Sequence, residues 1–565
     1  MTKTAAKSNA VGLHHFRKQR RNDKNGWVQL LFMDVRKKAV EFAVRKILEG
    51  GRDLDRIKRQ ACKRYGLAHM IKNPELLAAF PEGRLTPQLR QLLLKKPTKT
   101  ISGVTPVAVM IRPQGSCRHR CAYCPSGNLA AKSYTGFEPA ALRGRQYKFD
   151  PYSQAYNRAR QFEEGGHPAD KCEVIVMGGT FLQTAPGYRH SFIKGIYDGL
   201  NGSRSRTLNQ AETRNEKARH RVIGLTIETR PDVCREYIPE MLSYGATRVE
   251  LGVQHADDAI YRRINRGHRV KDVIDSTRDL KDAAFKVLYH IMPGLPGSNK
   301  RKDISFVKKL FSDKRFRPDM LKIYPTLVME GTLLQRWAEN GEFEAYSSEA
   351  AADVISEFYR HIPPYVRVMR IQRDIPAQKI HSGVMSSNLR ELVEQKVREK
   401  GIVPSEIRYR EIGMKKNPEQ KQNRQKNHQT ARAFDSFEIK RLDYGASGGK
   451  EFFISSEDEE GTIAGFVRLR FPSKGTMPQI DADTALIREL HVYGSELPIH
   501  EKAARRSGTF AQHRGLGSQL LKQAEDIARD GGRERMIVIS GVGAREYYRK
   551  LGYERLGPYM AKLLR

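Results

Sequence analysis

Residues 116–127 read SCRHRCAYCPSG and hold three of the six cysteines in the chain, Cys117, Cys121 and Cys124. The first gap is too wide for the CxxC pair of a zinc site, and no second CxxC follows to complete a tetrahedral set of ligands. Three closely spaced thiolates suit a four-iron four-sulfur cluster in which one iron lacks a protein ligand. An open iron of this kind can bind a small molecule through its amino and carboxylate groups.

The spacing of these cysteines, with Tyr123 before the last of them, resembles the signature of radical S-adenosylmethionine (SAM) enzymes. In that class the reduced cluster donates an electron to SAM, and the 5′-deoxyadenosyl radical that is released abstracts hydrogen from carbon. The resemblance implies that Cys117, Cys121 and Cys124 are the metal ligands. The alternative is that three unrelated thiols share one loop.

Short strand-like runs, separated by helix-length segments, follow the cysteine loop at 172–180, 221–232, 247–254, 286–297 and 320–328. Strands that alternate with helices predict a parallel sheet, here a partial (β/α) barrel. Barrel enzymes place their active sites at the carboxyl ends of the strands. The polar residues at those ends are Thr180, Glu228, Arg230, Gln254, His290, Lys322 and Tyr324. For any single one of them, packing in the barrel explains the residue as well as ligand contact does.

A glycine pair, Gly178 and Gly179, ends the first of these runs. Glycine leaves the backbone free to approach a ligand closely. The pair resembles the glycines that lie near the amino group of SAM in radical SAM enzymes, which implies a role in binding that cofactor.

A change of composition separates this region from the rest of the chain. Residues 414–433 contain six Lys and Arg, one acidic residue and many Gln and Asn, which predicts a linker. Contact of this basic stretch with RNA is the alternative. Beyond it, the runs 451–455, 462–470 and 485–494 predict antiparallel strands.

The turn QHRGLG (512–517) precedes a predicted helix and directs backbone N–H groups outward, where a pyrophosphate fits. With the run MIVIS (536–540) and the ending GAREYYRKLGYE (543–554), the order resembles the GNAT acetyltransferases. That resemblance implies that coenzyme A is held by Gln512, Arg514, Gly515, Leu516 and Gly517. It also puts Tyr548 where a tyrosine often protonates the departing thiolate. Since Tyr547 and Tyr548 cannot both face one core from a helix, one is expected at a surface or site.

The chain is strongly basic, with 101 Lys and Arg against 64 Asp and Glu and a net charge of +37. Residues 1–64 hold 18 of the basic and 6 of the acidic side chains. Such a charge attracts polyphosphates, although a well-solvated basic surface is the alternative. Residues 1–22 fit either a nucleic-acid arm or an organellar transit peptide. In residues 35–48, apolar positions recur every three to four residues and predict an amphipathic helix.

No apolar run approaches the roughly 20 residues of a membrane span. We therefore expect a cytoplasmic protein with reduced cysteines and no membrane partner.

The combination of both domains resembles the family of Elongator catalytic subunits, which modify the wobble uridine of tRNA. The motifs that match in order are SYTGFEP (133–139), VMGGTF (176–181), IETRPD (227–232), ELGVQ (250–254), MPGLPG (292–297), LKIYPTLV (321–328), IRELHVYG (487–494) and VISGVGAREYYRKLGYE (538–554). The resemblance implies an α/β multidomain protein. Its expected parts are a basic helical tRNA-binding region (1–95), a radical SAM partial barrel (96–390), a connecting segment (391–440) and a C-terminal GNAT α/β acetyltransferase domain (441–565).

The resemblance also implies a reaction. The SAM-derived radical takes hydrogen from the acetyl methyl group of acetyl-CoA, the carbon radical attacks C5 of the uridine, and thioester hydrolysis leaves a carboxymethyl group. The implied cofactors are a [4Fe-4S] cluster and SAM, with acetyl-CoA as co-substrate. The implied partner is the anticodon arm of tRNA, while a homodimer and Elongator-type accessory subunits remain open.

The family resemblance assigns residues to each of these roles. The implied catalytic residues are Lys322, Tyr324, Glu489, His491, Tyr547 and Tyr548. Those implied for SAM are Gly178, Gly179, Glu228 and Gln254. The candidate tRNA contacts are Arg17, Lys18, Arg20, Arg21, Arg36, Lys37, Lys38, Arg45 and Lys46.

The chain departs from the family in two respects, and the first is that many relatives have a longer gap between the first two cluster cysteines than the three residues found here. Relatives often carry a cysteine-rich metal site between the two domains, but this chain has no cysteine after Cys234. The charged pairs of RYREI (408–412) are a candidate replacement for that contact.

Two other function classes remain. One is a protein lysine acetyltransferase with a structural cluster, in which Glu489 or His491 acts as the base. The other is an RNA-binding scaffold, which leaves two cofactor signatures unexplained.

Overall fold

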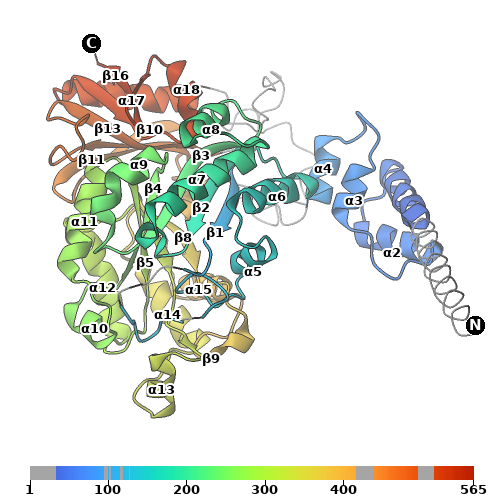
Figure 1. Ribbon diagram of the computed structural model, residues 1–565, viewed down its shortest axis with the longest axis horizontal. Coiled ribbons are helices and arrows are strands. Elements are labelled where there is room, and N and C mark those ends of the chain that lie inside the picture. Colours follow the sequence, from blue (N-terminus) through green and yellow to red (C-terminus); the bar gives the residue numbers. More distant parts are fainter. Residues whose placement is uncertain are drawn as a thin grey trace, which may run out of the picture. The chain divides into compact units, whose positions relative to one another are not determined.

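The computed structural model describes residues 33–94, 100, 103–114, 117, 119–125, 127–414, 437–493 and 515–564. The chain divides into two compact units, one of Met1–Thr98 with Gln161–His167 and the other of Lys99–Arg160 with Pro168–Arg565 (Figure 1). Among the helices that are described, none has the length and apolar character to cross a bilayer.

The smaller unit is a group of short helices. They are a helix over 33–48, α2 (Leu54–Arg64), α3 (Asn73–Ala78) and α4 (Pro87–Leu93). Ala39, Ala43 and Ile47 are buried on one face of the first helix, which confirms the predicted amphipathic helix. Asp53 caps α2 by accepting a hydrogen bond from the backbone N–H of Arg56 at 3.0 Å.

The larger unit begins with a seven-stranded parallel sheet in the order β1-β2-β3-β4-β5-β6-β8. Its strands are β1 (Thr105–Met110), β2 (Lys171–Met177), β3 (Arg221–Thr229), β4 (Arg248–Gln254), β5 (Lys286–Ile291), β6 (Met320–Ile323) and β8 (Arg367–Ile371). The longer helices between and after them are α5 (Pro139–Gln146), α6 (Pro151–Glu164), α7 (Pro186–Asn201), α8 (Leu208–Asn215), α11 (Val270–Asp282), α12 (Lys300–Ser312), α14 (Ser348–Phe358) and α15 (Leu389–Glu399). The predicted half-barrel is therefore confirmed.

The two faces of this sheet differ in character. Alternate residues, such as Val249 and Leu251 of β4, are buried in the apolar core against the helices. The strand register pairs charged residues on the inner face: Arg248 with Lys286, Glu228 with Glu250, and His290 with Lys322. The inside of the half-barrel is therefore lined with charges.

A second seven-stranded sheet follows in the order β10-β11-β12-β13-β14-β16-β15. Its strands are β10 (Glu438–Ala446), β11 (Gly449–Glu457), β12 (Ile463–Phe471), β13 (Thr484–Val492), β14 (Arg535–Val538), β15 (Glu554–Leu556) and β16 (Tyr559–Leu563). The pair β13–β14 is parallel, and the other pairs are antiparallel. Helix α17 (Leu516–Asp530) packs its buried residues, Leu520 and Ala524 among them, on this sheet.

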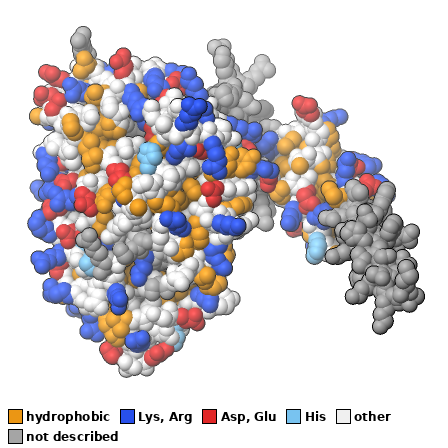
Figure 2. Space-filling view, in the orientation of Figure 1, with side chains coloured by type: hydrophobic (Ala, Val, Ile, Leu, Met, Phe, Trp, Pro, Cys, Tyr) orange, Lys and Arg blue, Asp and Glu red, His pale blue; other side chains and the backbone are white. Residues whose placement is uncertain are grey.

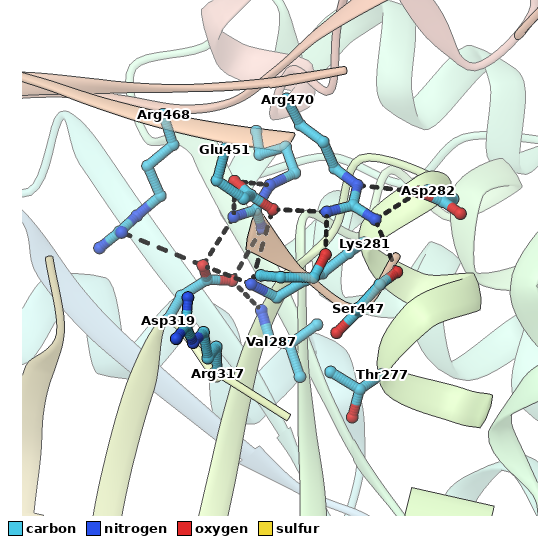
Figure 3. A network of polar contacts seen from close by, with 12 residues as sticks. Thr277, Lys281, Asp282, Val287, Arg317, Asp319, Ser447, Glu451, Arg468 and Arg470 are labelled. Carbon is cyan, nitrogen blue, oxygen red and sulfur yellow. Dashed lines mark hydrogen bonds and ion pairs between the residues drawn. The ribbon is translucent and has the colours of Figure 1, made fainter. Parts of the chain in front are cut away.

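Buried charged side chains join the two sheets (Figure 3). Arg488 of β13 donates hydrogen bonds to Asp319, which precedes β6, and to Glu451 of β11, each at 2.7 Å. Arg470 of β12 donates to Asp282 at the end of α11 at 2.8 Å and to Glu451 at 2.9 Å. All five side chains are fully buried. The half-barrel and the C-terminal sheet are therefore parts of one packed body.

The stretch RYREI contributes to the same contact. Arg410 donates to Glu457 of β11 at 3.0 Å, and Glu411 pairs with Arg367 of β8. Lys and Arg side chains are also spread over the face of the larger unit that Figure 2 shows, so the positive charge is not confined to the N-terminal region. The predicted linker, apart from Met414, lies outside the described residues.

Candidate active site

The cysteine loop follows β1 and is held by backbone hydrogen bonds. Ala122 donates its N–H to the carbonyl of Ile264 at 2.9 Å, and its own carbonyl accepts from Leu334 at 2.8 Å. Cys121 is buried, and Arg266 points a guanidinium nitrogen at its sulfur, 3.6 Å away. The loop is therefore held in place at Cys121 and Ala122, around the middle one of the three cysteines.

The residues of this loop fit an iron–sulfur cluster. Burial raises the pKa of Cys124 to about 11, and the nearby thiolates of Cys121 and Cys117 act in the same direction. Lys132 and Arg266 oppose that rise and would stabilise thiolates that ligate a metal. The three thiols thus lie close enough to affect one another.

Several buried polar atoms around the loop have no hydrogen-bond partner within the described part of the chain. They are the hydroxyl of Tyr123, both ring nitrogens of His268 and one guanidinium nitrogen of Arg230. Since buried polar groups are normally paired, such atoms are expected where a bound group completes the site.

Glu228 lies at the carboxyl end of β3 and binds two neighbours. Its Oε2 accepts a hydrogen bond from the hydroxyl of Tyr134 at 2.7 Å and from the backbone N–H of Gly178 at 3.2 Å. Gly178 has φ +138°, and a Cβ there would lie 2.6 Å from the side chain of Ile111. The glycine is therefore required, whereas Gly179 has open space beside it. The predicted residues Gly178 and Glu228 are brought together.

Three other polar residues predicted at the strand ends each have one buried polar atom without a hydrogen-bond partner among the described residues. Gln254 has φ +71°, and its Oε1 makes no hydrogen bond to a described residue; neither does the hydroxyl of Thr180. Arg230, in contrast, donates to Asp232 at 2.9 Å and to the carbonyl of Arg266 at 2.7 Å. Gln254 and Thr180 are thus free to contact a ligand, while Arg230 is mainly occupied.

Lys322 is paired with Glu250 of β4, a residue that sequence reasoning did not single out. Glu250 Oε2 also lies 2.8 Å from His290 Nε2. Burial raises the pKa of Glu250, but Lys322 and His290 more than offset this and hold that pKa below its usual range. The ring of Tyr324 packs edge-on against His290, with centroids 5.3 Å apart. The sequence contained a signal for Glu250, since ELGVQ (250–254) places an acid on a barrel strand two residues after Arg248.

Glu228, Glu250 and His290 bring ligand atoms within 4.8 Å of one another, a separation that would suit a metal ion. The ammonium group of Lys322 is already paired with Glu250 in this cluster. We therefore interpret the cluster as an ion-paired group at the strand ends rather than as a metal site.

In the C-terminal domain, α17 starts after Gly515, which caps it with φ +82°. A Cβ on Gly517 would lie 2.7 Å from the hydroxyl of Tyr547, so this tyrosine packs against the helix start. Tyr548 is buried in the core, whereas Tyr547 is 39% exposed. As expected, only one of the two tyrosines faces a surface. Gln512 and Arg514 lie outside the described residues.

Glu489 and His491 lie on β13. The pairing of β13 with β14 ends at Ile487. Glu489 accepts a hydrogen bond from Arg468 at 2.8 Å and lies 3.7 Å from Nζ of Lys286, the first residue of β5. Burial raises the pKa of Glu489, and Lys286 and Arg468 outweigh it, so that the pKa is about 2. These residues therefore face the end of the half-barrel where its strands begin.

His491 is partly buried, and its Nε2 has no hydrogen-bond partner among the described residues. Burial lowers its pKa to about 4, against the opposing effect of Glu489. The imidazole is therefore neutral at pH 7, with Nε2 or Nδ1 open to accept a hydrogen bond.

In the smaller unit, three of the five described candidates for tRNA contact already have acidic partners. Arg36 pairs with Glu75 at 2.6 Å, Lys38 with Asp34 at 2.8 Å, and Lys46 with Glu49 at 2.7 Å. Lys37 and Arg45 are exposed on the same helix. The other four candidates, Arg17, Lys18, Arg20 and Arg21, lie outside the described residues.

Comparison with protein families matches four models. These are the ELP3 N-terminal domain over residues 36–101, the radical SAM superfamily over 111–310, the radical SAM C-terminal domain over 318–399 and the GNAT acetyltransferase family over 419–553.

Curated proteins show the same likeness. The chain is 46% identical to a tRNA uridine(34) acetyltransferase of Dehalococcoides mccartyi, over 83% of this chain and all of that protein. It is 42% identical to one of Methanocaldococcus jannaschii, over 95% and 100%, and 39% identical to human Elongator complex protein 3, over 92% and 94%.

A solved structure, the Elp3 of Methanocaldococcus infernus lacking residues 1–46, matches with a TM-score of 0.71 and 43% identity. The match covers 82% of this chain and the whole of that one.

Proposed function

Because the chain belongs to the family of tRNA uridine(34) acetyltransferases and Elongator complex protein 3, we propose that it is an enzyme that modifies C5 of the wobble uridine of tRNA. The acetyl group of acetyl-CoA supplies the added carbons, and carboxymethyluridine is the product. The [4Fe-4S] cluster and SAM, when bound, would supply the 5′-deoxyadenosyl radical that removes a hydrogen atom from the acetyl methyl group.

Residues at the two ends of the half-barrel would carry out different steps of the reaction. Cys117, Cys121 and Cys124 would hold the cluster, and Glu228 with the backbone of Gly178 would position SAM. Lys322, paired with Glu250, keeps a positive charge at the strand ends where the uridine would enter.

In the acetyltransferase domain, Gly515 and Gly517 at the start of α17 would hold the pyrophosphate of coenzyme A. His491, which is neutral, would accept a hydrogen bond from the water that hydrolyses the thioester and orient it. Tyr547, exposed beside the helix start, is a better candidate than Tyr548 to protonate the thiolate.

The observation that carries the proposal is the 3.7 Å contact between Glu489 of the acetyltransferase domain and Lys286 of the half-barrel. It supports a reaction that uses both domains, since an acetyltransferase that acted alone would have no use for the barrel interior.

The test is mass spectrometry of nucleosides from tRNA incubated without oxygen with the iron-reconstituted protein, SAM, acetyl-CoA and a reductant. We expect carboxymethyluridine, and we expect it to vanish with Cys121→Ala and Cys124→Ala. Acetyl groups on protein lysines with no new nucleoside would instead identify a lysine acetyltransferase. No product of either kind would contradict the proposal.

A further inference from the structure

The inner face of the half-barrel has a gap at Gly224 of β3. A Cβ at this position would meet only Thr247 Oγ1 at 3.4 Å, Glu173 Cγ at 3.6 Å and Glu173 Oε1 at 3.9 Å among its nearest neighbours. These are ordinary contact distances, so an alanine would fit without strain. The glycine therefore leaves room for one methyl group beside two polar side chains.

Three side chains near this gap carry polar atoms with no hydrogen-bond partner among the described residues. They are the hydroxyls of Thr226 and Thr247 and the Nη2 atom of Arg248; Nε of Arg248 makes no hydrogen bond either but is ion-paired with Glu250. The residues are only 1%, 3% and 2% exposed, and Thr226 is the register partner of Arg248 across β3 and β4. Leaving such buried atoms unpaired is costly, so a group that accepts hydrogen bonds from them would be favoured.

The acetyltransferase domain adjoins the gap directly. Gly541, three residues beyond β14, packs so closely that a Cβ would lie 2.1 Å from the carbonyl oxygen of Ile223, the residue before Gly224. Lys286, the register partner of Arg248, is the residue that contacts Glu489. The gap thus lies between the C-terminal domain and the cluster of Glu250, His290 and Lys322.

The surrounding charges limit what the gap can hold. Arg248 is ion-paired with Glu173 through Nη1, and its Nε lies 3.5 Å from Glu250. Because both carboxylates would repel an anion, a free carboxylate such as acetate is disfavoured. A neutral oxygen acceptor of similar size fits the unpaired donors.

We propose that Thr226, Thr247 and Arg248 form a subsite for the acyl carbonyl oxygen of acetyl-CoA, with the absent side chain of Gly224 leaving room for the acetyl methyl group. The subsite rests on the proposed function, since it assumes that acetyl-CoA is the ligand of the C-terminal domain. It holds the acetyl group inside the barrel, two residues along β3 and β4 from Glu228 and Glu250, toward the end where the strands begin.

The test compares the affinities of acetyl-CoA and free CoA, which differ only by the acyl group, by calorimetry with tRNA present. The variants are Thr226→Val, Thr247→Val and Gly224→Ala. None removes a hydrogen bond between described residues, so their melting temperatures are expected to equal or exceed that of the wild type. The matched controls are Thr476→Val, which removes another unpaired buried hydroxyl, and Gly187→Ala, where a Cβ meets nothing within 4 Å.

We expect the wild-type preference for acetyl-CoA over CoA to fall by about threefold to tenfold in each variant, with CoA affinity unchanged and both controls like the wild type. The subsite would be overturned if the wild type showed no such preference. It would also be overturned if all three variants preferred acetyl-CoA over CoA as strongly as the wild type does. Acetate that displaces acetyl-CoA at similar concentrations would overturn it as well, because a carboxylate would then be the ligand. Wild-type protein that shows the preference but modifies no tRNA would contradict the proposed function and leave the subsite standing.

Discussion

Arg488 and Asp319 form a fully buried ion pair with two hydrogen bonds, from Nη1 to Oδ2 at 2.8 Å and from Nη2 to Oδ1 at 2.7 Å. The two residues are 169 positions apart and belong to the C-terminal sheet and the half-barrel. This pair, extended by Glu451, is the centre of the contact that holds the two catalytic domains in one orientation.

We expect Arg488→Met to destabilise the larger unit by about 3–5 kcal/mol, because Asp319 and Glu451 would remain as buried charges without their main partner. Urea denaturation measures the change. Arg441→Met is the control, since Arg441 and Asp443 form a pair that is 45% and 35% exposed and contributes at most about 1 kcal/mol. Equal effects of the two substitutions would show that the buried pair has no special role.

Arg266 donates a hydrogen bond to the sulfur of Cys121. Donation to a ligating sulfur stabilises the reduced form of an iron–sulfur cluster. We expect Arg266→Gln to shift the reduction potential of the reconstituted cluster to more negative values by tens of millivolts, since about 1.4 kcal/mol corresponds to 59 mV for one electron. Potentiometric titration followed by electron paramagnetic resonance measures it. Arg262→Gln, at an exposed position on the neighbouring helix, should leave the potential unchanged.

Lys37 and Arg45 are the exposed basic residues of the first described helix for which no acidic partner is seen among the described residues. We expect the double variant Lys37→Ala and Arg45→Ala to reduce the slope of log K for tRNA against log salt by about 1 per residue. The control, Lys38→Ala with Lys46→Ala, removes the same charge from residues that are paired with Asp34 and Glu49. Identical slopes for both variants would mean that only total charge matters.

The folded state holds the pKa of His491 near 4, below its ordinary value of 6.5. Between these values the unfolded chain binds a proton that the folded chain does not, so stability decreases as pH falls from 6.5 to 4. We expect His491→Gln to reduce the change in the free energy of unfolding between pH 4.5 and 7.5 by about 1–3 kcal/mol. Urea denaturation at pH 4.5 and 7.5 measures it, with exposed His381→Gln as the control. An unchanged pH dependence in His491→Gln would show that His491 does not carry it.

Much of the fold could be predicted from short stretches. The alternation of strand-like and helical runs indicated the half-barrel, and five of its seven strands overlap the predicted runs. Strand β8 has the sequence RVMRI, and its two arginines made it hard to recognise as a strand. In the structure it is the last strand of the parallel sheet. Gly178 was predicted to let the backbone approach a ligand, which stays a prediction; the structure shows a further reason for the glycine, since a Cβ there would meet the side chain of Ile111.

Only part of the candidate site could be predicted from the sequence. Lys322 was singled out, but its partner Glu250 is 72 residues away and could be recognised only when β4 and β6 were placed in one barrel. Arg36 was expected to contact tRNA, yet it is bound by Glu75, 39 residues away.

The sequence by itself determined the local features: the cysteine loop, the helix periodicity, the glycines at turns and helix starts, and the family to which these motifs belong. These depend on residues close in the chain, so their spacing is sufficient to reveal them. Only the tertiary structure decided which charges are paired, such as Arg470 with Asp282 over 188 positions, and where buried donors are left without partners around Gly224. The physical reason is that burial makes the energy of a charge or a hydrogen-bonding group depend on neighbours that folding brings together from distant parts of the chain.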